Sequence, residues 1–180
     1  IVPMPLPLDI VYEDEDLLVI NKASGMPIHP SQGNYDNTLA NACAYYFQQK
    51  GEPFTYRCIN RLDRDTSGLV LLAKSAYAKS AGIQALHCAE KEYVGLVFNR
   101  FAPDKGRIDL PIARETQPGS MRRLVLPGGQ PAATRYETLA DFGTYSRVRF
   151  LLETGRTHQI RVHFAHIGHP LVGDELYGGD

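Results

Sequence analysis

The sequence predicts an α+β fold with a mixed, largely antiparallel sheet and flanking helices. Short apolar runs of strand character recur along the chain between clusters of Gly, Pro, Asn and Asp. Only a few segments look helical, and they do not alternate with the strands as βαβ units do. With 180 residues, 43% of them hydrophobic, the chain has the length of a single domain, or of one domain with two lobes.

The first strands are expected on either side of an acidic turn, Glu13–Asp16. Ile10–Tyr12 and Leu17–Asn21 have the apolar and β-branched residues that are typical of strands. Residues 1–9 precede them as a proline-rich lead-in. Gly25–Asn34 contains Gly, Pro, His, Ser and Asn, and this composition predicts an irregular loop.

Two helices are expected in the first half of the chain. Thr38–Lys50 is predicted to be helical, with Asn37 as its N-cap and Gly51 as its stop signal. Ala76–Cys88 is predicted to form the second helix.

The second half of the chain has the features of further strands. Glu92–Asn99 has a mainly apolar composition, and Thr134–Leu139 and Arg147–Leu152 alternate as strands do. Between them, Pro103–Gly106 is expected to form a turn, and Ser120–Gly129 a basic loop or hairpin.

The segment Thr157–Phe164 alternates, which would suggest a strand. Three apolar residues recur instead at helical spacing: Ile160, Phe164 and Ile167. Gly168 and Pro170 follow as a helix stop. We therefore predict a helix that is capped by Thr157 and carries Arg161 in its first turns.

Charge is distributed unevenly along the chain, although the net charge is only −1. Residues 1–56 hold two Lys or Arg against seven Asp or Glu, whereas residues 57–161 hold seventeen against ten, most of the cations being arginines. Either one basic face binds a phosphate backbone, or the surface is an ordinary solvated one. Apolar runs fall well short of the roughly 18 residues of a membrane span, so no membrane partner is expected.

The three cysteines, Cys43, Cys58 and Cys88, are scattered among apolar or small residues. This pattern indicates reduced packing residues in a cytoplasmic protein, and it does not match a disulfide framework or a zinc site.

A polar loop follows in the region Ile59–Gly68, where Asp63 stands between Arg61 and Arg64. Short strands are expected on its two sides: Cys58–Ile59 and Leu69–Ala73. Neighbouring cations favour an ionised carboxylate, which can act as a nucleophile, a base or a metal ligand. Alternatively, Asp63 or Asp65 only fixes the turn, which is the commoner role of Asp in such a place.

The loop sequence RLDRDTSG (61–68) resembles the active-site signature of the RluA-type RNA pseudouridine synthase family. Two further blocks match that family in the same order. They are VYEDEDLLVINK (11–22) with SGMPIHP (24–30), and ETGRTHQIRVH (153–163) with GHP (168–170) and GD (173–174). The resemblance runs from about residue 10 to residue 177.

The resemblance implies a central catalytic cleft and the isomerisation of specific uridines to pseudouridine in structured ribosomal or transfer RNA, without a cofactor or a metal. It implies that Asp63 is the catalytic aspartate, which attacks ribose C1′ or uracil C6, or abstracts a proton. Tyr93 matches the tyrosine that stacks beneath the uracil, and Arg161 matches the arginine that pairs with the catalytic aspartate. The catalytic domain would span residues 10–180 and act as a monomer.

A target uridine must leave its stack in folded RNA, and Arg61 matches the residue that fills the vacated space. Further contacts with the RNA are expected at Arg64, Thr66, Arg122, Arg123, Arg135, Arg156 and His158. For Arg122, Arg123 and Arg135, a solvated surface is the competing interpretation.

Three other functions fit parts of the sequence. The spacing of Asp63 and Asp65 resembles the haloacid dehalogenase class of phosphotransferases, but Ser67 stands where that motif needs Thr or Val. A metal site would use several histidines near the C-terminus: His158, His163, His166 and His169. A non-catalytic RNA-binding module would keep the fold without the chemistry. The presence of Asp63, Tyr93 and Arg161 together favours the enzyme.

The sequence departs from the family pattern at Asn60, where His is usual, and at Ala23, where Pro is usual. Family members continue past Gly179 with a further strand-bearing segment, so the chain is expected to be cut there or to lack part of the sheet. Several relatives carry a small basic RNA-binding domain ahead of the catalytic domain. The nine residues before Ile10 are too few for one, so recognition is expected to rest on the catalytic domain unless a preceding part of the protein contributes.

Overall fold

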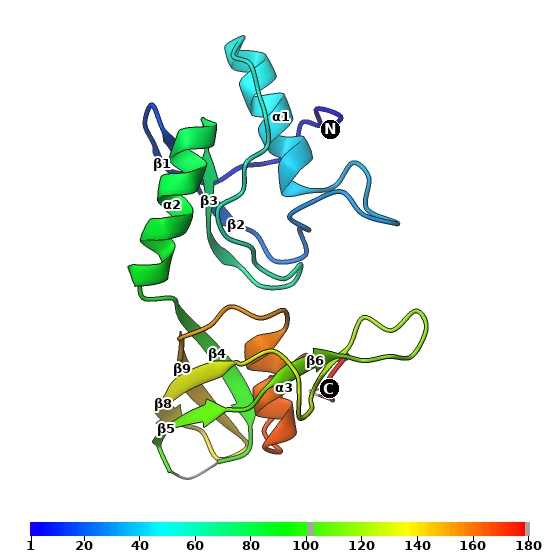
Figure 1. Cartoon of the computed structure of the whole chain (residues 1–180), viewed down its shortest axis with the longest axis vertical. Helices are drawn as coiled ribbons and strands as arrows, with labels where there is room; N and C mark the ends of the chain where they lie inside the picture. Colours follow the sequence, from blue (N-terminus) through cyan, green and yellow to red (C-terminus); the bar gives the residue numbers. More distant parts are fainter. Residues whose placement is uncertain (101–102, 179–180) are drawn as a thin grey trace. The chain divides into compact units, whose positions relative to one another are not determined.

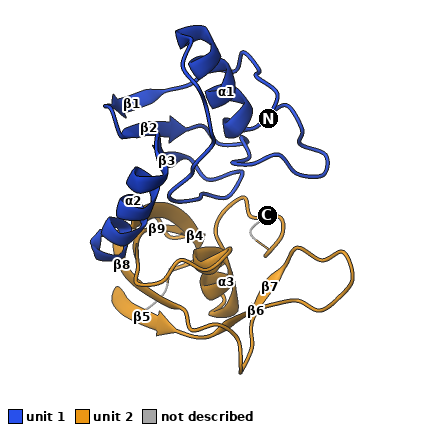
Figure 2. Ribbon diagram, turned by 45° about the horizontal axis from the view of Figure 1, so that its top comes forward, with its two compact units in different colours: residues 1–89 blue, residues 90–180 orange. Residues whose placement is uncertain are grey.

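The structure is a computed structural model that describes residues 1–100 and 103–178. The chain divides into two compact units, residues 1–89 and residues 90–180 (Figure 2). Each unit combines antiparallel strands with helices, which confirms the predicted α+β class. Gly179 and Asp180, where the sequence raised the expectation of truncation, lie outside the described residues.

The first unit contains a three-stranded antiparallel sheet in the order β1-β2-β3. Its elements (Figure 1) are β1 (Ile10–Glu13), β2 (Leu17–Lys22), α1 (Leu39–Lys50), β3 (Gly68–Ala73) and α2 (Ala76–Cys88). The acidic turn between the first two strands is closed by Asp14, whose carboxylate accepts the backbone N–H groups of Asp16 and Leu17. Alternate residues of β2 point into the core, and the core is completed by one face of α1.

Helix α1 begins one residue later than the sequence suggested. Thr38 is the N-cap, because its hydroxyl accepts the N–H of Asn41 while the Asn41 side chain accepts the N–H of Thr38. Asn37 instead donates to the side chain of Asn34, so its prediction as N-cap was wrong. The predicted stop is confirmed, since Gly51 takes the left-handed conformation with φ +68°.

Hydrogen bonds with Asn41 and Asn21 hold the lead-in against the rest of the first unit. The N–H of Met4 donates to the Asn41 carbonyl, and the Asn41 side chain donates to the Val2 carbonyl. At the other end of the lead-in, Asn21 binds the carbonyl and the carboxylate of Asp9. Residues 1–9 are therefore an ordered part of this unit.

The second unit contains a four-stranded antiparallel sheet in the order β4-β9-β8-β5 and a separate β6-β7 hairpin. Its elements are β4 (Glu92–Phe98), β5 (Lys105–Asp109), β6 (Ile112–Arg114), β7 (Arg123–Val125), β8 (Ala133–Asp141), β9 (Tyr145–Leu152) and α3 (Gln159–His166). Helix α3 covers one face of the sheet, where Phe164 packs edge-on against Phe150. The basic segment Ser120–Gly129 supplies only one arm, β7, of the β6–β7 hairpin. The turn predicted at Pro103–Gly106 was wrong, because β5 begins at Lys105.

Helix α3 confirms the helical interpretation of this segment, but its N-cap is His158 and not Thr157. His158 lies in the left-handed region, with φ 57°, and does not cap the helix through its side chain. Cys58–Ile59, predicted as a strand, forms only an isolated bridge between Cys58 and Leu72.

A partly exposed cluster of charges around Glu13 in the first unit gives a pH-dependent contribution to stability. The Glu13 carboxylate accepts hydrogen bonds from Lys74, Tyr46 and Lys50. Burial by itself raises the pKa of Glu13, but these hydrogen bonds outweigh it and lower the pKa to about 2.

We expect Glu13→Gln to lower the free energy of unfolding at pH 6, because the ion pairs of Glu13 with Lys50 and Lys74 are lost. The loss should be only about 1–2 kcal/mol, since the Glu13 side chain is partly exposed and solvent screens these ion pairs. The pKa is lower in the folded state than the ordinary value of 4.5. The stabilisation is therefore complete above that value and is lost as the pH falls towards 2. Urea unfolding at pH 6 and pH 3 should show the gap between wild type and variant narrowing at the lower pH. Glu15→Gln is the exposed control, and a gap that does not change with pH would contradict the assignment.

Candidate active site

The Asn60 side chain anchors the base of the Asp63 loop to β3 by hydrogen bonds to backbone groups that a neighbouring strand could otherwise bind. The Asn60 side chain donates to the Leu69 carbonyl at 3.0 Å and accepts the Leu71 N–H at 2.8 Å. The Ile59 N–H donates to the Leu71 carbonyl at 2.8 Å. Asn60 thus holds the loop where the family pattern has His, as its donor and acceptor groups allow.

The part of the Asp63 loop around Arg64 is held by hydrogen bonds from a buried lysine. Lys22 is 1% exposed, and its ammonium group donates to the carbonyls of Ala23 (2.8 Å), Met26 (2.9 Å) and Arg64 (2.9 Å). The Ser24 hydroxyl adds a bond to the Asp65 carbonyl at 2.8 Å. One cation therefore ties the segment after β2 to the segment that carries Asp63.

Lys22 also supplies positive charge beside the candidate nucleophile. Burial lowers the pKa of Lys22, and the carboxylates of Asp65 and Asp63 oppose that effect. Arg61 and Arg64 flank Asp63 in the sequence, whereas Lys22 is a further cation of this region that is distant in sequence.

The two aspartates of the loop differ in their surroundings. Asp65 is bound by the Arg64 guanidinium through contacts of 2.9–3.2 Å, and both side chains are largely exposed. Asp63 precedes a turn in which its carbonyl accepts the Thr66 N–H at 3.2 Å. Of the two, Asp63 is the one that the RLDRDTSG motif (61–68) marks as the candidate for chemistry.

In the second unit, Tyr93 lies on the face of the sheet that α3 covers. Tyr93 pairs with Phe150 in the sheet register, and Phe150 pairs with Tyr136, so the three side chains share a face. Tyr93 packs against this core and keeps part of its surface exposed. It is therefore a rigidly supported ring with an accessible part, as stacking on a base requires.

Arg161 of α3 is fixed by a two-pronged ion pair. Its Nε lies 2.7 Å from one oxygen of Asp174 and its Nη2 lies 2.8 Å from the other. The Asp174 side chain is 6% exposed, so the pair is shielded from water and its geometry is well defined. The predicted pairing of Arg161 with Asp63 would join the two units and stays a prediction.

Several of the predicted RNA contacts gather around Tyr177. The guanidinium groups of Arg122 and Arg161 lie over its ring, at 5.5 Å and 5.0 Å from the centroid. The Tyr177 hydroxyl accepts the Arg123 N–H at 2.8 Å and lies 2.8 Å from Nδ1 of His158. The structure therefore brings Arg122, Arg123, His158 and Arg161 together within the second unit.

Arg156 and Arg135 lie elsewhere in that unit. The Arg156 Nε donates to the Pro131 carbonyl at 2.8 Å. Arg135 pairs with Leu151 in the register, one residue from the row of Tyr93, so it lies on the opposite face of the sheet. There its Nε lies 3.5 Å from the Glu153 carboxylate, which Arg107 also binds. This position favours the solvated-surface interpretation of Arg135.

Two of the histidines near the C-terminus, His163 and His169, have structural partners. His163 is buried, with Nδ1 3.0 Å from the Thr134 hydroxyl and Nε2 2.9 Å from the Leu110 carbonyl, so both ring nitrogens are engaged. The His169 Nδ1 lies 3.0 Å from the Phe98 carbonyl. In residues 1–100 and 103–178, no three His, Cys, Asp or Glu side chains gather as a metal-binding group.

Gln159 holds the start of α3 against β8. Its side-chain oxygen accepts the Arg156 N–H and the Thr154 hydroxyl, and its nitrogen donates to Ala133 and Thr134. All of these bonds are buried or half-buried, so they fix the backbone from which His158 and Arg161 project.

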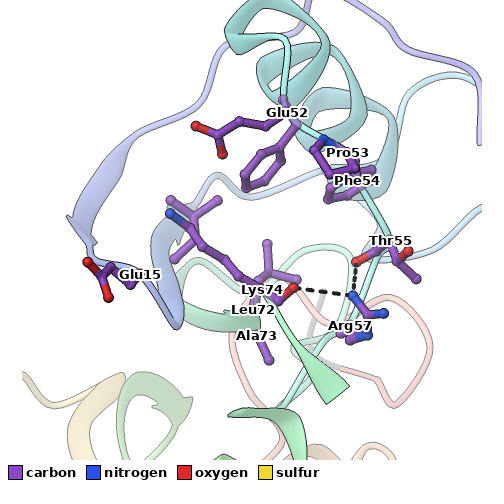
Figure 3. A pocket seen from close by; sticks show the side chains of 11 residues that line it. Glu15, Glu52, Pro53, Phe54, Thr55, Arg57, Leu72, Ala73 and Lys74 are labelled. Carbon is purple, nitrogen blue, oxygen red and sulfur yellow. Dashed lines mark hydrogen bonds between the residues drawn. The ribbon is translucent and has the colours of Figure 1, made fainter. Parts of the chain in front are cut away.

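A cavity of about 220 Å³ lies in the first unit, away from the Asp63 loop. Its lining side chains, nine of them labelled in Figure 3, include Leu18, Leu72 and Lys74. In the β2–β3 register, Lys22 pairs with Gly68 at the end of the two strands that adjoins the Asp63 loop. The cavity borders the opposite end of these strands, where Leu17 pairs with Ala73. Six residues of strand separate the two ends by roughly 17 Å, so the cavity is distinct from the candidate active site.

Three residues of this arrangement were not assigned a role from the sequence: Lys22, Asp174 and Tyr177. Lys22 follows Leu18 and Ile20 at the buried positions of an alternating strand, and a charged residue in that place signals a buried cation with backbone partners. Asp174 and Tyr177 carry no comparable local signal, because their partners are distant in sequence.

Within the described ranges, the helices are too short or too polar to cross a bilayer.

The chain is similar to curated proteins over nearly its whole length. Among curated relatives, ribosomal large subunit pseudouridine synthase D of Yersinia pestis is 45% identical over 179 residues, and the protein of that name from Haemophilus ducreyi is 44% identical over 180 residues. Both alignments cover 98% of this chain and 54% of the relative. The chain thus spans about half the length of the curated relatives it matches.

Two solved human structures have a similar fold. RNA pseudouridylate synthase domain containing 1 matches with a TM-score of 0.79 and 28% identity, over 96% of this chain and 70% of that chain. RNA pseudouridylate synthase domain containing 4 matches with a TM-score of 0.74 and 26% identity, over 94% and 68%. The family described as RNA pseudouridylate synthase matches residues 16–166, which include the Asp63 loop, Tyr93 and Arg161. The resemblance seen in the motifs is confirmed, and the chain belongs to the RNA pseudouridylate synthase family.

Proposed function

We propose that the protein isomerises specific uridines to pseudouridine in the RNA of the large ribosomal subunit, with Asp63 acting at the uracil–ribose junction. The observation that carries the proposal is the Asp63 loop, whose backbone is bound at Arg64 by the buried ammonium of Lys22, in a chain of this family. The names of the curated relatives support ribosomal RNA as the substrate class. Transfer RNA and a monomeric, cytoplasmic state are expectations from the sequence.

The reaction is an internal rearrangement that needs no redox partner. The bond between uracil N1 and ribose C1′ breaks, the uracil turns, and a bond forms between C5 and C1′. The hydrogen at C5 leaves as a proton and N1 gains one, so the composition is unchanged. Asp63 either attacks ribose C1′ or uracil C6, or abstracts a proton. The face of Tyr93 suits a base that is turned over, because stacking tolerates either orientation.

RNA binding is proposed to use the basic residues around Tyr177, together with Arg61, which fills the space of the extruded uridine. Arg64, Thr66 and Arg156 are retained as proposed contacts. A non-catalytic RNA-binding module would not need Asp63, Tyr93 and Arg161 together, because stacking and phosphate binding alone do not require an aspartate, so the enzyme is the better interpretation.

We expect Arg122→Ala to weaken RNA binding and to lower the slope of log affinity against log salt by about 1, as the loss of one phosphate contact does. Arg135→Ala is the matched control, since it lies on the opposite face of the sheet beside Glu153. We expect it to change binding little. Binding titrations at several salt concentrations test both variants, and equal losses would place Arg135 in the RNA interface after all.

The proposed reaction is tested by release of tritium from RNA labelled at uracil C5. Transcripts of large-subunit ribosomal RNA and of transfer RNA are compared, and modified positions are then mapped. Release from the ribosomal transcript supports the proposal. Binding of that transcript without release would support the RNA-binding module instead, and release only from transfer RNA would change the substrate class.

A further inference from the structure

Tyr177 stands out because it contacts two groups of residues that the proposed function treats separately. One group is the proposed catalytic arginine, Arg161, with its partner Asp174. The other is the set of proposed RNA contacts, Arg122, Arg123 and His158. The ring and the hydroxyl of Tyr177 meet different members of these groups.

The ring of Tyr177 contributes to the position of Arg161. The guanidinium lies 5.0 Å from the ring centroid, while Asp174 binds its Nε and Nη2 from the edge. The Tyr177 N–H also donates to the Asp174 carbonyl at 3.2 Å, which fixes the tyrosine relative to that partner. A planar guanidinium that has a ring on one side and a carboxylate in its plane has little freedom to rotate.

The hydroxyl of Tyr177 fixes two other parts of the unit. It accepts the N–H of Arg123 in β7 and lies 2.8 Å from Nδ1 of His158. A phenol carries one proton, so the arrangement that satisfies both partners has the hydroxyl donating to Nδ1. His158 sits in the left-handed conformation at the start of α3, which is uncommon for a residue with a side chain and is supported here by this bond.

Burial makes these contacts consequential. Tyr177 is 8% exposed, and burial raises the pKa of its hydroxyl, so the group is a neutral phenol at physiological pH. A buried hydroxyl that loses its partners, or partners that lose the hydroxyl, would be left unsatisfied. The hairpin, the start of α3 and Arg161 are therefore constrained to one arrangement.

We propose, on the basis of the proposed function, that Tyr177 is a positioning residue that couples the RNA-contacting residues of β7 and His158 to Arg161. Its hydroxyl acts on RNA binding and its ring acts on the orientation of Arg161. Binding of RNA at the hairpin then favours the arrangement in which Arg161 is set for catalysis.

The test separates the two parts of the side chain. Tyr177→Phe keeps the ring and removes the hydroxyl, and Tyr177→Leu removes both. Asp174→Asn weakens the other constraint on Arg161. Tyr145→Phe is the control, since Tyr145 packs against Phe98 away from this cluster. Each variant is measured for KM and kcat of tritium release, and by NMR for solvent exchange of the Arg161 Nε–H and the Arg123 amide.

For Tyr177→Phe we expect faster exchange of the Arg123 amide and a KM raised by about threefold or more, with kcat little changed. For Tyr177→Leu we expect, in addition, faster exchange of the Arg161 Nε–H and a kcat lowered by about tenfold or more. Asp174→Asn should lower kcat alone.

The inference is overturned if both tyrosine variants leave the two exchange rates unchanged. It is also overturned if they only lower thermal stability and the active fraction, with KM as in wild type, because a purely structural residue would do that. Wild-type protein that releases no tritium would instead overturn the proposed function. The exchange measurements need no activity, so they still decide whether Tyr177 positions Arg161 and Arg123.

Discussion

Asp63→Asn is expected to abolish tritium release, with a loss of about 10³-fold or more, while RNA binding stays near that of wild type. The amide has nearly the shape of the carboxylate, so the loop should keep its bonds to Lys22 and to β3. It lacks the charge and the nucleophilicity that each of the three possible roles of Asp63 requires. Single-turnover tritium release and a binding titration, performed on the same preparation, measure the two effects.

Asp65→Asn is the matched control for this prediction. Asp65 lies two residues further along the same loop and is bound by the exposed Arg64 guanidinium, so its loss should leave most of the activity. Release by Asp63→Asn with none by Asp65→Asn would move the catalytic role to Asp65. Loss of binding in Asp63→Asn would indicate that the carboxylate serves the fold of the loop.

Lys22→Met is expected to lower the free energy of unfolding by about 3–5 kcal/mol, because three part-buried carbonyls lose their common donor and the buried end of the side chain loses its hydrogen bonds. Methionine has a similar length, so the effect isolates the ammonium group from the volume of the side chain. The loss of the Arg64 contact should also release the tip of the Asp63 loop, and a displacement of about 1 Å is enough to lower kcat by about 100-fold.

Urea unfolding measures the stability, and tritium release at a temperature where the variant is folded measures the activity. Lys79→Met, at a half-buried position on α2, is the control for removing a lysine from this unit. An unfolding free energy within about 1 kcal/mol of wild type would show that water replaces the ammonium without cost.

Elements with strong local signals could be predicted from the sequence. Helix α2 has its predicted bounds, and Ser75 caps it by accepting the Ala78 N–H. The strands β2 and β3 were located to within a residue because their apolar runs are bounded by turn residues. In the Asp63 loop, the motif itself identified the candidate nucleophile.

Elements that depend on distant partners were missed. The strand β5 is short and charged, and it is stabilised by pairing with β8, where Lys105 binds Glu137 at 2.8 Å. The N-cap position of His158 depends on Tyr177, nineteen residues further along the chain. Nothing in the spacing around Thr157 reveals that partner, so the local rule for N-caps gave the wrong residue.

The bond from Lys22 to the Arg64 carbonyl joins residues that are 42 positions apart, and this separation has a consequence for how the protein acquires its activity. Closing so long a segment costs entropy that only the pairing of β2 with β3 and the packing of α1 can offset. A peptide containing the loop alone would not hold Asp63 in place. The position of the Asp63 loop therefore depends on the folding of the whole first unit and not on the loop sequence alone.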